Sequence, residues 1–194
     1  MRPHNTLFSL QQMILDLAAI HRDHMHVGSE RHENDIEHSF TVGLLCWFIC
    51  EHHKLNLDQA KILKYAMAHD FVERYAGDTN TYASDSERQR KTKLEKVALE
   101  RLSREFSDFE NLVEIMQAYE AKADDEALFV WTVDKMQQLI LGDMDNWRPY
   151  RKINITYEQF EQKVTEHLGK ASPHCKEIFS ELLAYCKTTY YDRP

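Results

Sequence analysis

Helical periodicity runs through nearly the whole chain and constrains its fold more than any other feature. Between residues 7 and 21 the apolar side chains recur at steps of three and four, and most later segments repeat this spacing. The 194 residues include only five glycines and four prolines, which is typical of long helices joined by short connections. We find no pair of strands, no internal repeat and no long linker. The pattern predicts an all-α fold in which residues 1–194 form a single domain.

About eight or nine helices are expected. The segment 36–53 is the most apolar and should form the centre of the core. Asn56 is a candidate N-cap for the helix that follows, and Thr156 with Gln159 is a candidate capping box further on. A loop is expected at 23–33 and another at 142–155. The expected helices are 7–21, 36–53, 57–69, 86–103, 108–123 and 125–141, with a short segment at 70–78 and C-terminal helices within 156–190.

Composition limits the partners that this chain can have. Hydrophobic residues make up 43% of the sequence, which is enough for a real core. The formal net charge of -8 argues against a nucleic-acid polymer or an anionic membrane as the partner, because both require a basic surface. The longest apolar run, residues 42–50, is too short to span a bilayer. A small phosphate-bearing substrate remains compatible, since a metal and a few basic side chains can reverse the field locally.

The cysteines indicate a reducing compartment. Cys46 and Cys50 lie one helical turn apart and could be read as a metal-binding pair. They sit in an apolar stripe, however, where a free cysteine packs as a small apolar residue. A domain of this size also does not need disulfides, so Cys175 and Cys186 are expected to be free as well. We expect an intracellular, cytoplasmic protein.

Two histidines and two aspartates suggest a metal site. His69 and Asp70 close the apolar run 62–68, His38 lies upstream, and Asp134 lies downstream within another apolar segment. Each residue alone would more often be a solvated or hydrogen-bonded side chain. A carboxylate buried at position 134 would need a positive partner, either a metal or a nearby Lys or Arg. Together the four side chains can hold one divalent transition metal and leave coordination positions open, as hydrolysis requires.

The residues around these four positions carry a family resemblance. The sequence resembles the HD-domain phosphohydrolases, and most closely their small 5'-deoxynucleotidase-like branch. The resemblance covers roughly residues 7–141, with a motif core at 31–141. Its most specific part is the block HDxxExxxGD, formed by His69, Asp70, Glu73, Gly77 and Asp78. The matching segments are 31–39, 68–79 and 133–135.

The resemblance implies roles for these residues. His38, His69, Asp70 and Asp134 would be the metal ligands. Glu73 and Asp78 would lie beside the attacking water and the leaving group and would handle protons. Pairing of Glu73 with Arg74 or Arg31 is the structural alternative, since Glu73 follows Asp70 by one helical turn.

Arginines upstream of the first ligand are the candidates for binding the substrate phosphate. Arg22 matches the family's arginine if one residue is inserted before Arg31. Arg31 itself either contacts substrate or holds the ligand residues in place. The segment after Arg22 departs from the relatives, which have a tryptophan there. His24 and His26 could contact substrate in its place, but exposed loop histidines are the expectation. The histidines at 52, 53, 167 and 174 are also expected at the surface.

The resemblance also implies a single metal ion. Binuclear relatives draw extra histidines from the interval between the HD pair and the last aspartate, and here residues 71–133 contain none. Histidine and carboxylate ligands suit Mn, Co, Fe, Ni or Zn. A homodimer or larger homo-oligomer is implied as well.

The activity implied is metal-dependent release of phosphate from deoxyribonucleoside 5'-monophosphates. A deoxynucleoside triphosphate triphosphohydrolase, similar to phage dATPases, is the alternative. It would use the same ligands and further cations, for which Arg88, Arg90, Lys91 and Lys93 are candidates. A non-catalytic nucleotide-binding module is a third hypothesis, although the presence of both Glu73 and Asp78 argues against it.

Overall fold

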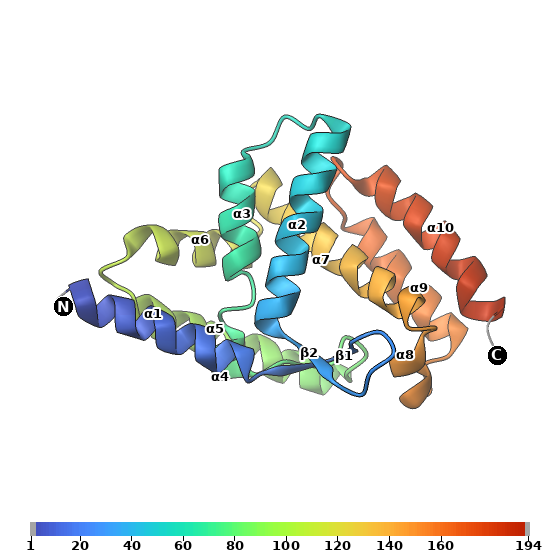
Figure 1. The fold of residues 1–194 in the computed structure, drawn as a ribbon, viewed down its shortest axis with the longest axis horizontal. Helices are drawn as coiled ribbons and strands as arrows, with labels where there is room; N and C mark the ends of the chain where they lie inside the picture. Colours follow the sequence, from blue (N-terminus) through green and yellow to red (C-terminus); the bar gives the residue numbers. More distant parts are fainter. Residues whose placement is uncertain (1–2, 193–194) are drawn as a thin grey trace.

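The computed structural model describes residues 3–192, which fold into helices with one small sheet (Figure 1). Two of the helical segments, α4 and α8, are only four and five residues long. The described residues therefore confirm an all-α architecture, and the eight longer helices agree with the expected number. The helices are α1 (Pro3–Ala18), α2 (Asp35–His53), α3 (Gln59–Ala68), α4 (Glu73–Ala76), α5 (Asp85–Glu105), α6 (Glu110–Ala121), α7 (Asp125–Met144), α8 (Arg148–Lys152), α9 (Tyr157–Gly169) and α10 (Lys176–Asp192).

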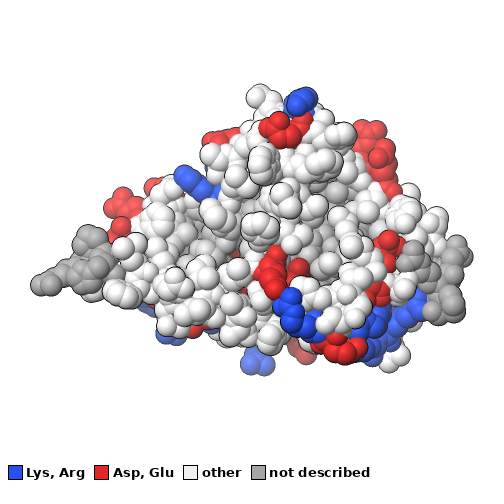
Figure 2. Space-filling view, viewed as in Figure 1, with Lys and Arg blue, Asp and Glu red and all other residues white. Residues whose placement is uncertain are grey.

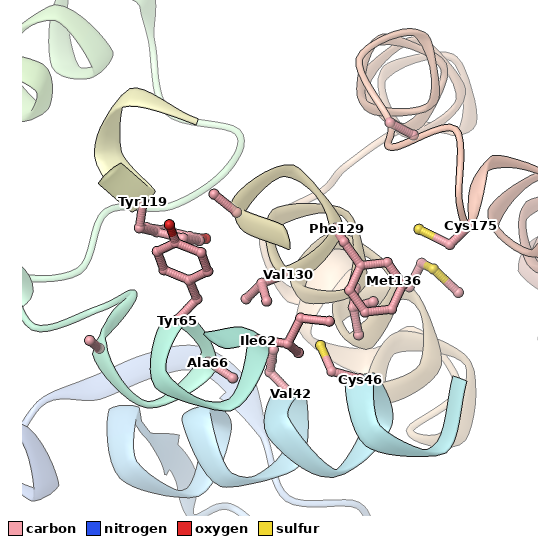
Figure 3. Packing of buried hydrophobic residues seen from close by; sticks show 14 of the residues in the cluster. Val42, Cys46, Ile62, Tyr65, Ala66, Tyr119, Phe129, Val130, Met136 and Cys175 are labelled. Atoms are coloured by element: carbon pink, nitrogen blue, oxygen red, sulfur yellow. The ribbon is translucent and has the colours of Figure 1, made fainter. Parts of the chain in front are cut away.

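The centre of the molecule is formed by α2, α3 and α7. Helix α2 crosses in front of α7, and α3 packs beside both (Figure 1). Their contact is a dry apolar layer in which Val42, Ile62 and Val130 are almost fully buried (Figure 3). The apolar segment 36–53 therefore lies at the centre, as its sequence predicted. Because the metal-ligand candidates lie on these same three helices or directly after them, the core also fixes the site.

Side-chain caps set where several helices begin. Asn34 caps α2 by accepting hydrogen bonds from the backbone N–H groups of Ile36 and Glu37, and the Glu37 side chain reaches back to the Asn34 N–H. The capping box predicted at Thr156 and Gln159 is confirmed. The predicted N-cap at Asn56 was wrong. Asp58 takes that role, because its carboxylate accepts from the Lys61 N–H.

A short hairpin corrects the expectation of a loop at 23–33 and of no paired strands. Strand β1 (His21–Met25) pairs antiparallel with β2 (His32–Asn34), with His21 opposite Asn34. The connecting turn contains Gly28 at φ 69°, a conformation that glycine adopts without strain. The strands lack an apolar alternation because one of their buried side chains is Arg22. Its burial depends on carboxylates distant in sequence, so local periodicity could not reveal it.

The C-terminal helices pack against α7 rather than against the hairpin. Figure 1 shows α9 and α10 side by side along one flank of α7. Cys175 reaches the core from the start of α10 (Figure 3), and Cys46 and Cys50 reach it from α2. All four cysteines are buried and free, as predicted. Among residues 3–192, no helix is both long and apolar enough to cross a bilayer.

One face of α2 and α3 carries exposed apolar side chains. On α2 these are Phe40, Leu44, Trp47 and Phe48, which recur at helical spacing and are between 53 and 75% exposed. Leu63 of α3 adjoins them, since its side chain approaches Gly43. Figure 2 shows this side of the molecule as a mainly uncharged surface. We refer to Phe40, Leu44, Trp47, Phe48, Leu63 and Met67 as the apolar face.

Candidate metal centre

His38 is held in the first turns of α2 and is completely buried. Its Nε2 lies 3.2 Å from Oδ1 of Asp134 and 3.6 Å from Oδ2 of Asp70. Burial and Arg22 oppose its protonation, yet the carboxylates of Asp134 and Glu33 raise the pKa of His38 to about 9. The surroundings of this imidazole therefore attract positive charge strongly.

His69 follows the last residue of α3 and presents one ring nitrogen to the same point. Its Nδ1 lies 2.9 Å from the backbone oxygen of Ala66. A backbone acceptor at Nδ1 fixes the ring orientation and leaves Nε2 available as a ligand atom. That Nε2 lies 3.2 Å from Oδ2 of Asp70, which is the next residue along the chain.

Asp134 enters the cluster from the middle of α7 with its two oxygens in different environments. Oδ2 accepts a hydrogen bond of 2.7 Å from the Lys135 ammonium, whereas Oδ1 faces His38. Burial alone would raise the pKa of Asp134, but Lys135 and then His38 hold it well below its usual range. Asp134 is therefore a buried, ionised carboxylate with one oxygen free to bind a cation.

The donor set fits a metal ion. Nε2 of His38, Nε2 of His69 and Oδ1 of Asp134 are all buried and have no hydrogen-bond partner in the described structure. One ligand atom from each of these residues lies within 4.8 Å of the others. Buried polar atoms normally have partners, so three orphaned ligand atoms facing one point are what a bound divalent cation would explain. The structure thus brings together the four residues that the sequence predicted as ligands.

A second acidic group adjoins the first. Asp35, Asp70 and Glu73 also bring oxygens within 4.8 Å of one another. The Arg22 guanidinium lies among them, with Nη1 2.6 Å from Asp70, 3.5 Å from Asp35 and 4.0 Å from Glu73. The single arginine therefore compensates this group only in part. The expectation of a single ion stays a prediction, since two neighbouring groups of candidate ligands are present.

Glu73 stands at the start of α4 and is 5% exposed. Burial and the neighbouring Asp70 raise its pKa well above the usual range. Its Oε1 accepts from the Lys91 ammonium at 3.1 Å, so the alternative pairing with Arg74 or Arg31 is not observed. Asp78 lines the same cavity, where its Oδ1 accepts from the Thr79 N–H. The structure thus brings both predicted proton-handling residues beside the ligand set.

The two predicted substrate arginines have different positions. Arg22 lines the cavity but is buried and ion-paired with Asp70, so its first role is to compensate the acidic cluster. Arg31 does not reach the cavity. Its side chain is 54% exposed and pairs with Glu37 on the outer surface. The prediction that Arg31 contacts substrate or holds the ligand residues is therefore corrected, because the β1–β2 hairpin directs it outward.

A cavity of about 410 Å³ opens over these residues, a size typical of small-molecule sites. At one side it is lined by Asp70, Glu73 and Asp134, and at another by Tyr82 and Tyr150, whose rings meet edge to face. Aromatic walls of this kind accept a nucleobase or another flat ring. The cavity therefore combines acidic side chains, among them two candidate metal ligands, with an aromatic wall.

Two predictions about histidines were wrong. His24 is not an exposed loop residue: it lines the cavity beside Tyr150, and burial followed by Arg22 lowers its pKa to about 4. His26 instead faces Glu37. His167 packs edge-on against Trp131, so it is not a free surface residue either. Strand pairing places His24 here, and no local signal marks it.

Sequence reasoning also missed several cavity residues. Lys91 was considered as one of four cations after the motif, and it is the member that lines the cavity. Lys122 and the two tyrosines carried no signal, because a single lysine or tyrosine is usually a surface or core residue. Asp35 lay within the recognised motif block but received no role. The missed residues that the structure places at the site are Asp35, Tyr82, Lys122 and Tyr150.

A helical domain with a buried cluster of candidate His and Asp ligands beside a substrate-sized cavity is typical of metal-dependent enzymes. The comparison with known families is more specific. Residues 16–176 match the HD-domain family, and the chain belongs to that family. No curated protein matches the chain.

A solved structure supports the fold over the whole chain. The crystal structure of a predicted metal-dependent phosphohydrolase from Magnetospirillum magnetotacticum MS-1 superposes with a TM-score of 0.78. The match covers 100% of this chain and 99% of that one, at 21% sequence identity. At this identity the similarity establishes a shared fold.

Proposed function

We propose that this protein is a metal-dependent phosphohydrolase that releases phosphate from deoxyribonucleoside 5'-monophosphates. The observation that carries the proposal is the set of three orphaned buried ligand atoms on His38, His69 and Asp134, two of which, His69 and Asp134, belong to residues that line the cavity. Membership of the HD-domain family supports it. So does the similarity in fold to the Magnetospirillum protein, which is described as a predicted metal-dependent phosphohydrolase.

The proposed ligands are His38, His69, Asp70 and Asp134. A divalent metal held there would lower the pKa of a bound water and polarise a phosphoryl oxygen. The protein's own side chains orient the ligand carboxylates. Lys135 keeps Oδ2 of Asp134 occupied, and Arg22 does the same for Oδ2 of Asp70, so each carboxylate is fixed in orientation.

Proton transfer is assigned to Glu73 and Asp78. The raised pKa of Glu73 favours a protonated carboxyl group that can donate to a leaving oxygen. Asp78 follows Gly77, which has φ 73°, so the chain turns there and brings this carboxylate to the cavity wall. A deoxyribose and base would then lie toward Tyr82 and Tyr150.

A triphosphohydrolase is the second candidate. It is favoured by one observation, the lysines at 91, 122 and 135 that line the cavity. A longer phosphate chain needs more cationic contacts than one phosphate. Both candidates predict cleavage of the bond nearest the sugar.

A nucleotide panel with product analysis tests the proposal. The protein, loaded in turn with Mn, Co, Ni, Fe or Zn, is incubated with deoxy- and ribonucleotides, and products are separated by chromatography. Nucleoside and phosphate from deoxynucleoside monophosphates is the expected result, with ribonucleotides slower. Nucleoside and intact triphosphate, with inert monophosphates, would support the second candidate. Nucleoside diphosphate as the main product contradicts both, and no turnover with any nucleotide would favour a binding module.

A further inference from the structure

Lys122 occupies an unusual position at the wall of the cavity. It is the C-cap of α6 and has a left-handed backbone conformation with φ 49°. Its half-buried side chain turns back over the Tyr119 ring, with the ammonium 3.9 Å from the ring centroid. The ammonium also donates a hydrogen bond of 2.7 Å to the Tyr119 backbone oxygen. The side chain thus lies along the cavity wall and not in open solvent.

Lys122 differs from the other cations of the cavity in that its ammonium has no carboxylate partner among the described residues. Within the part of the chain that the structure describes, no carboxylate oxygen lies within 4.0 Å of its ammonium, whereas every other lysine or arginine lining the cavity has one. The paired cations are Arg22 with Asp70 at 2.6 Å, Lys91 with Glu73 at 3.1 Å, Lys135 with Asp134 at 2.7 Å and Lys152 with Glu30 at 2.8 Å.

The surroundings of Lys122 compensate the charge of its ammonium only in part. Burial lowers the pKa of Lys122; the carboxylate of Glu120 counteracts this, and Lys135 adds to it. Glu120 and Glu95 also line the cavity, so this wall holds charges of both signs. A lysine that is partly desolvated without a direct counter-ion is destabilised. An anionic group of a bound ligand would remove that cost.

The position of Lys122 relative to the ligand set indicates which anionic group of a ligand this lysine would bind. The ring of Tyr119 contacts both: its centroid lies 3.9 Å from the Lys122 ammonium and 5.7 Å from the centroid of the His69 ring, which it meets edge-on. Lys135 and Lys91 instead contact Asp134 and Glu73 directly, so they are placed to serve a phosphate at the metal centre. Lys122 lines the same cavity but contacts the ligand set only through the Tyr119 ring and pairs with none of its carboxylates.

We propose that Lys122 forms a second phosphate subsite, which binds a phosphate group beyond the one held at the metal centre. This inference rests on the proposed metal-dependent phosphohydrolase activity and favours the triphosphohydrolase candidate over the monophosphate one. The site would then bind a nucleoside bearing two or more phosphates more tightly than its monophosphate. Lys122 is a specificity-determining residue in this scheme and takes no part in proton transfer.

A purely structural role for Lys122 is the competing explanation, since basic side chains often bind the last carbonyls of a helix. The chain offers a matched control. Lys54 is also a lysine C-cap in the left-handed conformation, at φ 53°, but its side chain is 81% exposed at the far end of α2. Asparagine tolerates this backbone conformation. Lys122→Asn and Lys54→Asn therefore remove the same charge at equivalent backbone positions.

Calorimetric binding to the metal-loaded protein tests the subsite without requiring turnover. The probes are inorganic phosphate and inorganic pyrophosphate, with metal in excess of the probe so that the protein stays loaded. We expect the wild type to bind pyrophosphate more tightly than phosphate. Lys122→Asn should weaken pyrophosphate binding about tenfold, the scale of one charged hydrogen bond, and change phosphate binding less than about twofold. Lys122→Arg should retain the pyrophosphate preference, and Lys54→Asn should match the wild type.

Other outcomes would contradict the second phosphate subsite. Unchanged pyrophosphate binding in Lys122→Asn, or equal losses for both probes, overturns the second subsite. A drop in thermal stability for Lys122→Asn alone, with normal pyrophosphate binding, identifies the helix-capping role instead. The nucleotide panel is independent of these measurements. Monophosphate turnover with no selective pyrophosphate loss leaves the proposed function standing and the subsite refuted. A selective loss of pyrophosphate binding in Lys122→Asn, without turnover of any nucleotide, supports the subsite and refutes the proposed function.

Discussion

The Arg22 guanidinium lies 2.6 Å from the carboxylate of Asp70, although 48 residues of chain separate the two. This contact joins the β1–β2 hairpin to the end of α3. It also places a permanent positive charge against a carboxylate that would bind the metal. His69 and Arg22 hold the pKa of Asp70 well below its usual range, even though burial would raise it. The acidic cluster is therefore partly compensated by the protein's own arginine.

Removal of this arginine should destabilise the fold. Arg22→Gln leaves Asp70, Asp35 and Glu73 without their buried cation, and breaking such a pair typically costs about 3–5 kcal/mol. Arg31→Gln is the control, because Arg31 pairs with Glu37 at the surface, where a pair contributes less than about 1 kcal/mol. Urea unfolding in the presence of a chelator measures both. Equal stability of the two variants would mean that Arg22 does not compensate the cluster.

The candidate metal ligands could be proposed from the sequence because the motif fixes both residue types and spacing, and the structure brings them together. His69 and Asp70 are adjacent in sequence, and the fold only has to bring His38 and Asp134 to them. Arg22, His24 and Lys122 were harder, since their roles depend on contacts between distant elements. The hairpin places Arg22 and His24, and a left-handed cap directs Lys122. Neither the strand pairing nor the left-handed backbone conformation at Lys122 produces a periodic or compositional signal in the sequence. The same lack of signal explains why the two strands were not predicted.

Asp134→Asn should lose the metal. The substitution keeps the size of the side chain but removes the charge of the oxygen that faces His38. We expect metal content by elemental analysis and phosphohydrolase activity to fall together. Asp125→Asn is the control, because this aspartate lies at the start of the same helix with its side chain 71% exposed. Full metal occupancy in Asp134→Asn would remove Asp134 from the ligand set.

Glu73→Gln should separate metal binding from rate. Since glutamine cannot donate or accept the proton, turnover is expected to drop by about two or more orders of magnitude while metal content stays normal. Glu95→Gln is a close control, because Glu95 also lines the cavity and also pairs with Lys91, at 3.5 Å. Asp78→Asn should behave as Glu73→Gln does. Near-normal turnover in Glu73→Gln would return this residue to a structural role.

Stability should fall with acid partly because of His167. Burial, followed by Lys135 and Lys163, lowers its pKa to about 3, whereas the unfolded chain titrates near 6.5. Between these values the unfolded state binds a proton that the folded state does not, so stability is lost as the pH falls from about 6.5 toward 3. His167→Gln should reduce the slope of unfolding free energy against pH by up to about 1.4 kcal/mol per unit.

Denaturant unfolding at several pH values gives this slope directly. His53→Gln serves as the control, since His53 is exposed at the end of α2. The variants can differ in absolute stability without affecting the comparison. Only the slope of the unfolding free energy against pH depends on the difference in bound protons between the unfolded and folded states. An unchanged slope in His167→Gln would show that His167 is not protected from protonation in the folded state.

The apolar face is the surface on which we expect a second copy of this chain to bind. Its four α2 side chains alone include three aromatics that are 55–75% exposed. Scaled by these exposed fractions, three aromatic side chains of about 200 Å² each contribute roughly 400 Å², and the aliphatic members bring the face to on the order of 600 Å² of apolar surface. A standard homodimer interface buries about 800 Å² per partner, of which roughly two thirds is apolar. The face is therefore large enough, and an uncharged patch is complementary to itself.

Sedimentation of the wild type and of Trp47→Glu tests this interface. The chain has a mass of 23.0 kDa, so the wild type should sediment at about twice that mass and Trp47→Glu at the monomer mass, because a charge at the centre of an apolar interface cannot be paired there. Tyr185→Glu is the matched control: Tyr185 is 54% exposed, close to the 55% of Trp47, but lies on α10, away from the apolar face. A monomeric wild type, or a Trp47→Glu variant that remains dimeric, would exclude this face as the interface. Dissociation of both variants would point to a general effect of added charge on association.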